Sequence, residues 1–433
     1  MTTTFATLKQ RLSEGIGDWI EVDTTTNITT NTSVISTSLN QYDNGADDFF
    51  NSWYVLITEG NNINVERQIS DYATATGTIT VRGANLLAET GAVTIWVGRY
   101  SYSNKGKAIN RAIEEVFPAL HKKVDDITLI AGNYLPNSHF EDWASSSYPD
   151  KYAVTNATSA ANTTAGNYRG GGKSSLVTAS GADGYMYITS NDYPRLLDLM
   201  DQVIDFKCWV KPEVADDAFL TIYTVQADGT AQTLNSTTTC PSGKWALLEL
   251  EQQTINDNIV EIQFRFRVHT NTRYAYFDNA RVTGVTNNEL VLPTKLQKGV
   301  VTQVYIQTSG GSDDMCDDIH PMYWDRIFSY DLVDDGTSEY LVLPTGYSKQ
   351  LVRVVGLTPF TALSSSTDTI PIDEGGQTNM LVAYAAYKLF KMEGKPTNRE
   401  TISDKVDESD YFGEYQRLLR KFGMTSPSGT MRV

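Results

Sequence analysis

The sequence has few cysteines and histidines and no long apolar run, the features by which metal-binding, disulfide-rich and membrane proteins are usually identified. Its 433 residues include three cysteines and four histidines, with no spacing typical of a metal site or a catalytic triad. Cys208 and Cys240 fall in one predicted domain, where we expect buried free thiols rather than a disulfide. No apolar run reaches the roughly 20 residues of a membrane span, and the polar N-terminus lacks the apolar core of a signal peptide. We expect a protein without a membrane span, soluble or exported by a route the sequence does not show.

Positive charge is also scarce. The chain has 35 Lys and Arg against 52 Asp and Glu, a formal net charge of −17. This charge argues against nucleic acid as a main partner, because phosphate binding needs a cationic surface, although local basic faces stay open. No glycine-rich phosphate loop, nucleophile elbow or catalytic carboxylate pair stands out, and we predict that the protein is not an enzyme.

One acidic group resembles a metal site only superficially. It lacks the glycine and closing glutamate of a calcium loop, which predicts a solvated loop. Nothing else in the sequence supports the neighbouring Cys316 and His320 as a catalytic dyad. The acidic residues are Asp313, Asp314, Asp317 and Asp318.

The abundance of Thr, Tyr and Gly predicts an α+β, mostly β fold. Residues 1–132, the N-terminal arm, begin with a short helix from Phe5 to Leu12. Short strands separated by turn signals follow, which predicts a small β-barrel or sandwich. The expected strands are residues 19–22, 34–39, 53–57, 64–69, 78–81 and 93–100.

An amphipathic helix is expected over residues 105–120, capped by Asn104 and kinked or ended near Pro118. Its apolar face packs either on its own domain or on a neighbouring subunit. The opposite, exposed face is expected to carry Lys105, Lys107, Arg111, Glu114 and Glu115.

Residues 285–433, the C-terminal arm, repeat the plan of strands followed by helices. A hairpin turn is expected at Asp334-Asp335-Gly336, and the last residues, 425–433, carry no packing signal and are expected to be mobile or ordered by a partner. Helices are predicted at 378–393, buried nearly all round, and at 403–422. We expect the three main helices of the two arms to pack together. The expected strands are 300–306, 322–327, 340–343 and 351–357.

Between the arms, residues 133–284 alternate between apolar and polar side chains with a period of two. This predicts an inserted β-sandwich with one set of residues in the core between two sheets. The inward set is Met186, Ile188, Phe206, Cys208, Val210, Leu220, Ile222, Phe264, Phe266 and Val268.

Five segments of the insert, in order, resemble carbohydrate-binding modules of the galactose-binding-like jelly-roll type. They are Asn137 with Phe140-Glu141 and Trp143; Gly172-Lys173-Ser174-Ser175-Leu176-Val177; Phe206-Lys207-Cys208-Trp209-Val210-Lys211; Gly243-Lys244-Trp245; and Ala275-Tyr276-Phe277-Asp278-Asn279-Ala280-Arg281-Val282. The resemblance covers about 150 residues and implies a jelly roll. It also implies a structural calcium held by Glu141, Asp278 and backbone carbonyls; the alternative is that these carboxylates only cap turns.

Sugar binding would need aromatic rings that stack on a pyranose and polar groups for its hydroxyls. Outward residues of the insert could supply both if they share a concave face. The alternative is that Tyr, Thr and Lys are there for strand propensity alone, because function depends on the site rather than the fold. The candidates are Tyr185, Tyr187, Trp209, Tyr223, Arg265 and Arg267.

The arms resemble minor structural proteins near the head–tail junction of tailed bacteriophages. The similar segments are Asn62 to Asn85, Lys107-Ala108-Ile109-Asn110-Arg111-Ala112-Ile113, and Leu381-Val382-Ala383-Tyr384-Ala385-Ala386-Tyr387-Lys388-Leu389. The resemblance implies a homo-oligomeric ring, often of twelve copies, beneath the portal and beside neck or tail proteins. An acidic lumen would let DNA pass without specific binding.

Three functions compete on these grounds. The first is a virion head-to-tail adaptor or neck subunit with a projecting carbohydrate-binding-like domain, assembled in the host cytoplasm and located at the head–tail junction. The second is a tail or baseplate protein whose insert binds cell-surface glycan for host attachment. The third is a secreted carbohydrate-binding protein, which the missing signal peptide and missing carboxylate pair disfavour.

Overall fold

The computed structural model describes residues 2–29, 31–308, 324–372, 375–393 and 407–423. They form two compact units, one of residues 2–122 with 359–423 and one of residues 123–358. The predicted boundaries at residues 132 and 285 both fall within the second unit. The acidic group at 313–318, Cys316 with His320, residues 403–406 of the last predicted helix and the tail at 425–433 lie outside the described residues.

The first unit contains a six-stranded antiparallel sheet with its own apolar core, including Val55, Ile69 and Val97. The predicted strand at 34–39 is too long: it ends at Ile35, and a 3-10 turn follows at Thr37–Gln41. Between them the Ser36 hydroxyl donates to the Asp23 carbonyl, which turns the chain out of the ladder. The strands, in the order β2-β7-β4-β5-β6-β3, are β2 (Ile20–Asp23), β3 (Ser33–Ile35), β4 (Tyr54–Ile57), β5 (Glu66–Ala73), β6 (Thr78–Val81) and β7 (Thr94–Gly98).

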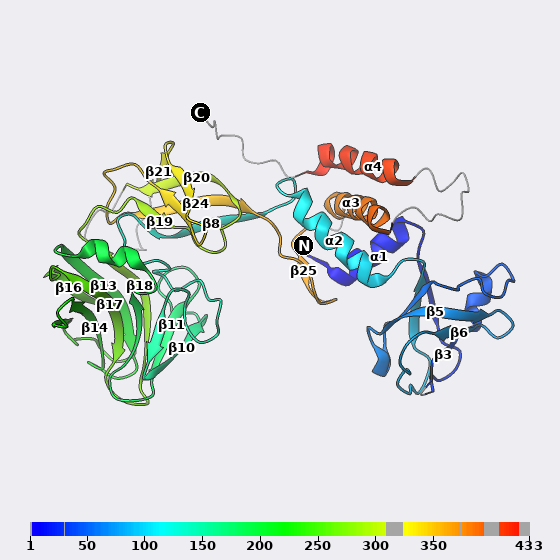
Figure 1. Cartoon of the computed structure of the whole chain (residues 1–433), viewed down its shortest axis with the longest axis horizontal. Helices are drawn as coiled ribbons and strands as arrows, with labels where there is room; N and C mark the ends of the chain where they lie inside the picture. Colours follow the sequence, from blue (N-terminus) through cyan, green and yellow to red (C-terminus); the bar gives the residue numbers. More distant parts are fainter. Residues whose placement is uncertain (1, 30, 309–323, 373–374, 394–406, 424–433) are drawn as a thin grey trace. The chain divides into compact units, whose positions relative to one another are not determined.

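Helices from both ends of the chain share one core in the first unit, as predicted. Figure 1 shows them side by side, α2 in cyan and α3 in orange. Leu381, Ala385 and Leu389 of α3 are at most 1% exposed, because that helix is apolar nearly all round. Strand β1 (Thr3–Thr4) also pairs with β25 (Thr369–Ile370), which joins the two arms by backbone hydrogen bonds. The helices are α1 (Phe5–Gly15), α2 (Tyr102–Val116), α3 (Gly376–Glu393) and α4 (Asp407–Phe422).

The prediction for the start of α2 was wrong. The helix begins at Tyr102, and its N-cap is Ser101, whose hydroxyl accepts the backbone N–H of Asn104. Asn104 therefore lies inside the first turn instead of capping it. The helix ends at Val116, before Pro118, as expected for a residue that cannot continue a helix.

Lys105 was also predicted wrongly, because it is fully buried rather than exposed. Its Nζ lies 2.9 Å from Asp18 Oδ2 and donates to the Ser13 hydroxyl. Asp18 also accepts the backbone N–H groups of Arg99 and Tyr100, so it is fixed beside the first turn of α2. Helical periodicity could not show this carboxylate, which comes from the loop between α1 and β2.

The second unit contains two small sheets, and one of them combines strands from both arms. Strand β8 (Lys122–Ile130) of the N-terminal arm lies beside β24 (Leu351–Thr358) in the sheet β21-β20-β24-β8. The ion pair between Asp125 and Arg353 links these two strands. A turn follows Asp334, as predicted, in the sheet β19-β23-β22. The remaining strands are β19 (Glu289–Val291), β20 (Val300–Gln307), β21 (Trp324–Ile327), β22 (Asp331–Asp334) and β23 (Glu339–Val342).

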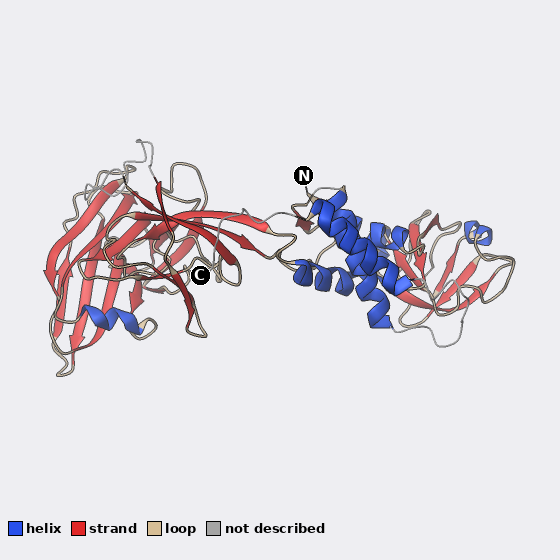
Figure 2. Ribbon diagram, turned by 90° about the horizontal axis from the view of Figure 1, so that it is seen from above, coloured by secondary structure: helices blue, strands red, loops and turns tan. Residues whose placement is uncertain are grey.

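The rest of the second unit is a β-sandwich of two five-stranded sheets. Sheet 1 has the order β10-β11-β18-β13-β16, and sheet 2 has the order β15-β14-β17-β12-β9. Figure 2 shows that strands dominate this part of the chain, with one short helical turn at Pro194–Leu199. The strands are β9 (Ala153–Thr155), β10 (Ala157–Asn162), β11 (Ser174–Ala179), β12 (Gly184–Thr189), β13 (Val203–Pro212), β14 (Ala218–Gln226), β15 (Ala231–Asn235), β16 (Ala246–Thr254), β17 (Ile259–Val268) and β18 (Tyr274–Thr283).

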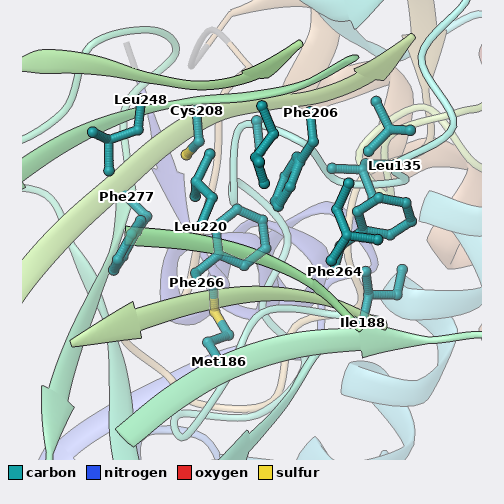
Figure 3. Close-up of a cluster of buried hydrophobic side chains, with 14 of the residues drawn as sticks. Leu135, Met186, Ile188, Phe206, Cys208, Leu220, Leu248, Phe264, Phe266 and Phe277 are labelled. Atoms are coloured by element: carbon teal, nitrogen blue, oxygen red, sulfur yellow. The ribbon is translucent and has the colours of Figure 1, made fainter. Parts of the chain in front are cut away.

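The core of the sandwich confirms the predicted alternation, since all ten residues expected to point inward are fully buried. Figure 3 shows the aromatic centre of this core, where Phe206 meets Phe264 and Phe266 at centroid distances of 5.1 and 5.5 Å. Cys208 and Cys240 are buried free thiols. The predicted fold class, mostly β with several antiparallel sheets and an inserted sandwich, is confirmed. No helix among the described residues is long and apolar enough to span a membrane.

Candidate functional site

The outer side of sheet 2 carries five of the six predicted glycan-binding residues. They alternate with core residues on β12, β14 and β17, so their side chains point away from the interior. The strand register places Arg265 between Tyr187 and Thr221, and Arg267 between Tyr185 and Phe219. We name this surface the aromatic–arginine face; its residues are Tyr185, Tyr187, Phe219, Tyr223, Arg265 and Arg267.

Arg265 lies at the centre of the aromatic–arginine face. Its guanidinium carbon is 3.9 Å from the ring centroid of Tyr223 and 4.8 Å from that of Tyr185, so two aromatic rings hold it. Contacts of this kind contribute roughly 0.5–2 kcal/mol each, depending on desolvation. Partial burial lowers the pKa of Arg265 from its ordinary value, but an arginine stays protonated in proteins.

A row of hydrogen bonds along β17 fixes the orientation of Arg265. Its Nε donates to Gln263 Oε1 at 2.8 Å, and Gln263 Nε2 donates to Glu261 Oε1 at 2.6 Å. The same Glu261 oxygen accepts the Thr189 hydroxyl at 3.2 Å. Side chains two residues apart on one strand can form such a row because they share one face of the sheet.

Arg267 is only partly neutralised. It lies 3.4 Å from Asp183 Oδ1, an oxygen that also binds His269 Nδ1 at 2.7 Å. Its guanidinium stacks on Phe219, with the carbon 4.6 Å from the ring centroid. Arg267 and His269 thus share the Asp183 carboxylate at this end of the aromatic–arginine face.

Trp209 does not join the other candidates. It lies on β13 in sheet 1, whereas the other five belong to sheet 2. The Arg169 guanidinium carbon stacks 3.9 Å from the centroid of the indole. Trp209 is thus stacked by an arginine as Tyr223 is, but on the opposite sheet, so it does not belong to the aromatic–arginine face.

Sequence reasoning missed two members of the site, Phe219 and Gln263. Phe219 could have been found, because the alternation of β14 begins at Ala218, two residues earlier than the run of residues 220–223 considered. Gln263 carries no local signal. Its importance depends on the hydrogen bonds along β17, which alternation alone does not show.

The two predicted metal ligands, Glu141 and Asp278, hold the same glycine-rich loop, residues 169–173. Asp278 Oδ2 accepts backbone N–H groups from the first two residues of the loop at 2.5 and 3.0 Å. Glu141 Oε1 accepts those of the last two at 2.6 and 2.9 Å. This is the geometry of carboxylates that anchor a turn, and it places the two predicted ligands close together.

Burial disfavours ionisation of both carboxylates. It raises the pKa of Asp278 to about 7, with a smaller contribution from the charge of Glu141, and it raises the pKa of Glu141 as well. Two neighbouring carboxylates with hard oxygen donors fit the chemistry that calcium prefers. Among the described residues no group of three or more His, Cys, Asp or Glu is placed to hold a metal. Carbonyl oxygens and water would have to complete the shell, and calcium stays a prediction.

A cavity of about 550 Å³ lies in the second unit beside this segment, lined mainly by residues 128–151 and 289–297. Asp142 in its wall accepts the backbone N–H of Thr294 at 2.8 Å. His139, also in the wall, is buried, and within the described residues neither of its ring nitrogens has a hydrogen-bond partner. Burial lowers the pKa of His139 to about 4, so the ring is neutral at pH 7. None of the six residues of the aromatic–arginine face lines this cavity.

No protein-family model matches the chain, and no curated protein matches it. Among solved structures it is similar to a xylan-binding domain of carbohydrate-binding module family 22, at 16% identity, 36% of this chain, 97% of that domain and a TM-score of 0.30. It is similar to the first family 22 xylan-binding domain of Paenibacillus barcinonensis Xyn10C, at 15% identity, 38% and 99% coverage and a TM-score of 0.28. It is also similar to the enzymatically active domain of bacteriophage CBA120 tailspike protein 4, at 11% identity, 36% and 22% coverage and a TM-score of 0.27.

Proposed function

We propose that the β-sandwich binds glycan through the aromatic–arginine face, without catalysis. The observation that carries the proposal is the position of Arg265 against the rings of Tyr223 and Tyr185 on one outward surface. Aromatic rings stack on the apolar side of a pyranose, and guanidinium and amide groups donate to its oxygens. Arg265 and Gln263 supply such donors within the same surface.

The proposal is tested by affinity electrophoresis of the full chain in gels that contain one polysaccharide each. Binding retards the wild-type protein, and Tyr223→Ala is expected to lose at least 10-fold in affinity, about 1.4 kcal/mol. Tyr276→Ala is the matched control, because Tyr276 is a half-buried tyrosine on β18 in sheet 1. Loss of binding in Tyr276→Ala but not in Tyr223→Ala would contradict the proposed surface.

We also propose that Glu141 and Asp278 hold a structural calcium that keeps the loop at 169–173 in place. The support is the pairing of two desolvated carboxylates on one loop. A ligand that binds only the folded state raises the melting temperature. An unchanged melting transition after addition of a chelator would contradict this proposal.

A second role is proposed for the arms, on their resemblance to head–tail junction proteins of tailed phages. The protein would be a head-to-tail adaptor or neck subunit of the virion, with portal and neck or tail proteins as neighbours. The support is that resemblance, and the structure adds only that helices from both ends of the chain form a single core, so the arms are one folded part rather than two linkers. The alternatives of a tail or baseplate attachment protein and of a secreted binder share the glycan face but not the ring.

Mass measurement separates these roles. Light scattering of the full chain, alone and with portal protein, is expected to reveal a ring of many copies for an adaptor. A strict monomer at high concentration, with portal present, would contradict the adaptor role while leaving the glycan proposal intact.

A further inference from the structure

We propose that the aromatic–arginine face selects acidic glycans, and that Arg265 binds the carboxylate of a uronic-acid-type sugar. This inference rests on the proposed glycan binding and names the ligand class of the same face. It follows from what the guanidinium of Arg265 touches and from what it leaves free.

Arg265 keeps most of its hydrogen-bonding capacity. A guanidinium has five N–H donors in a rigid planar fork. One of them, on Nε, is donated to Gln263, which leaves the four on the two terminal nitrogens. In the part of the chain that the structure describes, Arg265 forms no ion pair with a carboxylate. The two terminal nitrogens are the pair that binds a carboxylate through parallel hydrogen bonds.

Among the described residues Arg265 has no carboxylate partner, although acidic residues outnumber basic ones in the chain and give it a net charge of −17. Three arginines of the second unit do have such a partner: Arg353 pairs with Asp125, Arg273 with Glu213, and Arg195 with Glu289. Glu261, the acidic residue of the same row, hydrogen-bonds to Gln263 rather than to Arg265, and its charge acts on the guanidinium only across that distance. The cation at the centre of the face therefore has no carboxylate in direct contact among the residues that the structure describes.

The guanidinium is held in place before any ligand binds. Tyr223 and Tyr185 contact it at 3.9 and 4.8 Å, and Gln263 fixes its Nε. A fixed arginine loses little side-chain entropy on binding, which favours affinity. Partial burial also removes competing water from the cation and strengthens its attraction to an anion.

Acidic sugars fit this arrangement better than neutral ones. A neutral pyranose offers hydroxyl groups, which can use single donors but leave the positive charge of Arg265 unmatched. A uronic acid carries a planar carboxylate on its pyranose ring. The carboxylate can bind Arg265 while the ring stacks on a neighbouring tyrosine, so a single sugar unit contacts both kinds of side chain. Arg267, whose partner Asp183 is shared with His269, adds a second positive charge nearby.

The test compares acidic polysaccharides with their own carboxyl-reduced forms, which differ only at the carboxylate. Polygalacturonate and hyaluronate, each in both forms, are titrated into the full chain by affinity electrophoresis, with dextran sulfate as a generic polyanion. The wild-type protein is expected to bind at least one acidic form at least 10-fold more tightly than its reduced form. Arg265→Gln is expected to lose about 10- to 100-fold for that polymer, because hydrogen bonds to charged groups are the stronger ones.

Two variants control for charge and folding. Arg265→Lys keeps the charge without the fork and is expected to bind between wild type and Arg265→Gln. Arg273→Gln removes an arginine that already pairs with Glu213 at 3.1 Å and is expected to bind as wild type does. Unchanged melting of the Arg265 variants confirms that they are folded.

The remaining outcomes distinguish a failure of acidic-glycan selection from a failure of glycan binding itself. Equal binding of acidic and reduced forms, or binding of neutral polymers alone, would overturn the selection of acidic glycans while glycan binding stands. If dextran sulfate binds as tightly as the acidic sugars, the face is a non-specific polyanion-binding surface. That result would contradict the proposed recognition of a sugar carboxylate by Arg265. Failure of every acidic and neutral polymer to bind would overturn glycan binding itself, and this inference with it.

Discussion

The pH dependence of stability provides a test of the buried carboxylate Asp278. Its side chain is fully buried, and burial raises its pKa from 3.8 to about 7. A difference of that size between the folded and unfolded states corresponds to about 4 kcal/mol in the free energy of unfolding, at about 1.4 kcal/mol per tenfold change in proton affinity. This is a large share of the 5–15 kcal/mol that is typical for a domain.

Whether stability rises or falls with pH depends on whether the folded or the unfolded state binds the proton more tightly. Because the folded state holds it more tightly than the unfolded state, the contribution of Asp278 is fully present below pH about 4 and is lost as the pH rises through about 7. His139 acts the other way: its pKa is lowered to about 4, so its contribution is present above its ordinary pKa of 6.5 and is lost as the pH falls. The free energy of unfolding of the wild type therefore contains both contributions at each pH. Subtracting the free energy of unfolding of Asp278→Asn at the same pH removes the contribution of His139.

Calorimetric unfolding of the full chain and of Asp278→Asn between pH 4.5 and 8, in chelator, measures this difference. Relative to the variant, the wild type is expected to lose roughly 3 kcal/mol across the range, because part of the full difference is already lost at pH 4.5. Added calcium is expected to suppress the loss in the wild type only, because a bound cation stabilises the ionised carboxylate. A constant difference between the two proteins at every pH would refute the assigned pKa and its cause.

Three further substitutions test the packing. Lys105→Met leaves Asp18 buried without its cation and is expected to destabilise the first unit by about 3–5 kcal/mol. In a calorimetric double-mutant cycle, adding Asp18→Leu should recover most of this loss. If the two substitutions act independently, the buried ion pair is contradicted. Phe266→Ala removes a ring that contacts Phe206 and Phe277 and should destabilise the sandwich by about 3–5 kcal/mol. A change in melting temperature no larger than that of an alanine substitution at the surface would contradict this value. His139→Leu removes a buried ring that has no hydrogen-bond partner among the described residues, and it should stabilise the sandwich by roughly 1 kcal/mol at pH 7 and more at lower pH. Destabilisation in a melting experiment would show that the ring has a partner or a packing role that these contacts do not reveal.

The sandwich was the part of the fold most open to prediction. Alternation with a period of two assigned every tested core residue, from Met186 to Val268, because one face of each strand is buried. The same rule placed Tyr185, Tyr223 and Arg265 outside. It could not assign them to a sheet, since alternation separates inward from outward but not one sheet from the other, and so Trp209 was grouped with residues of the opposite sheet.

The errors elsewhere involve partners distant in the sequence. Lys105 reads as exposed by helical periodicity, and only the loop carrying Asp18 explains its burial. Strand β8 lies in the N-terminal arm but belongs beside β24, more than 200 residues later, because strand pairing leaves no signal in either strand alone. The sequence likewise could not show that no described carboxylate pairs with Arg265, because it shows neighbours along the chain and not across the sheet.

Glycan binding by the aromatic–arginine face is best tested by a crystal structure of the full chain with a bound oligosaccharide of the polymer that binds most tightly. We expect a sugar ring over Tyr223 or Tyr185, with sugar oxygens about 2.7–3.2 Å from the terminal nitrogens of Arg265. A sugar bound over Trp209, or in the cavity beside Asp142, would contradict it.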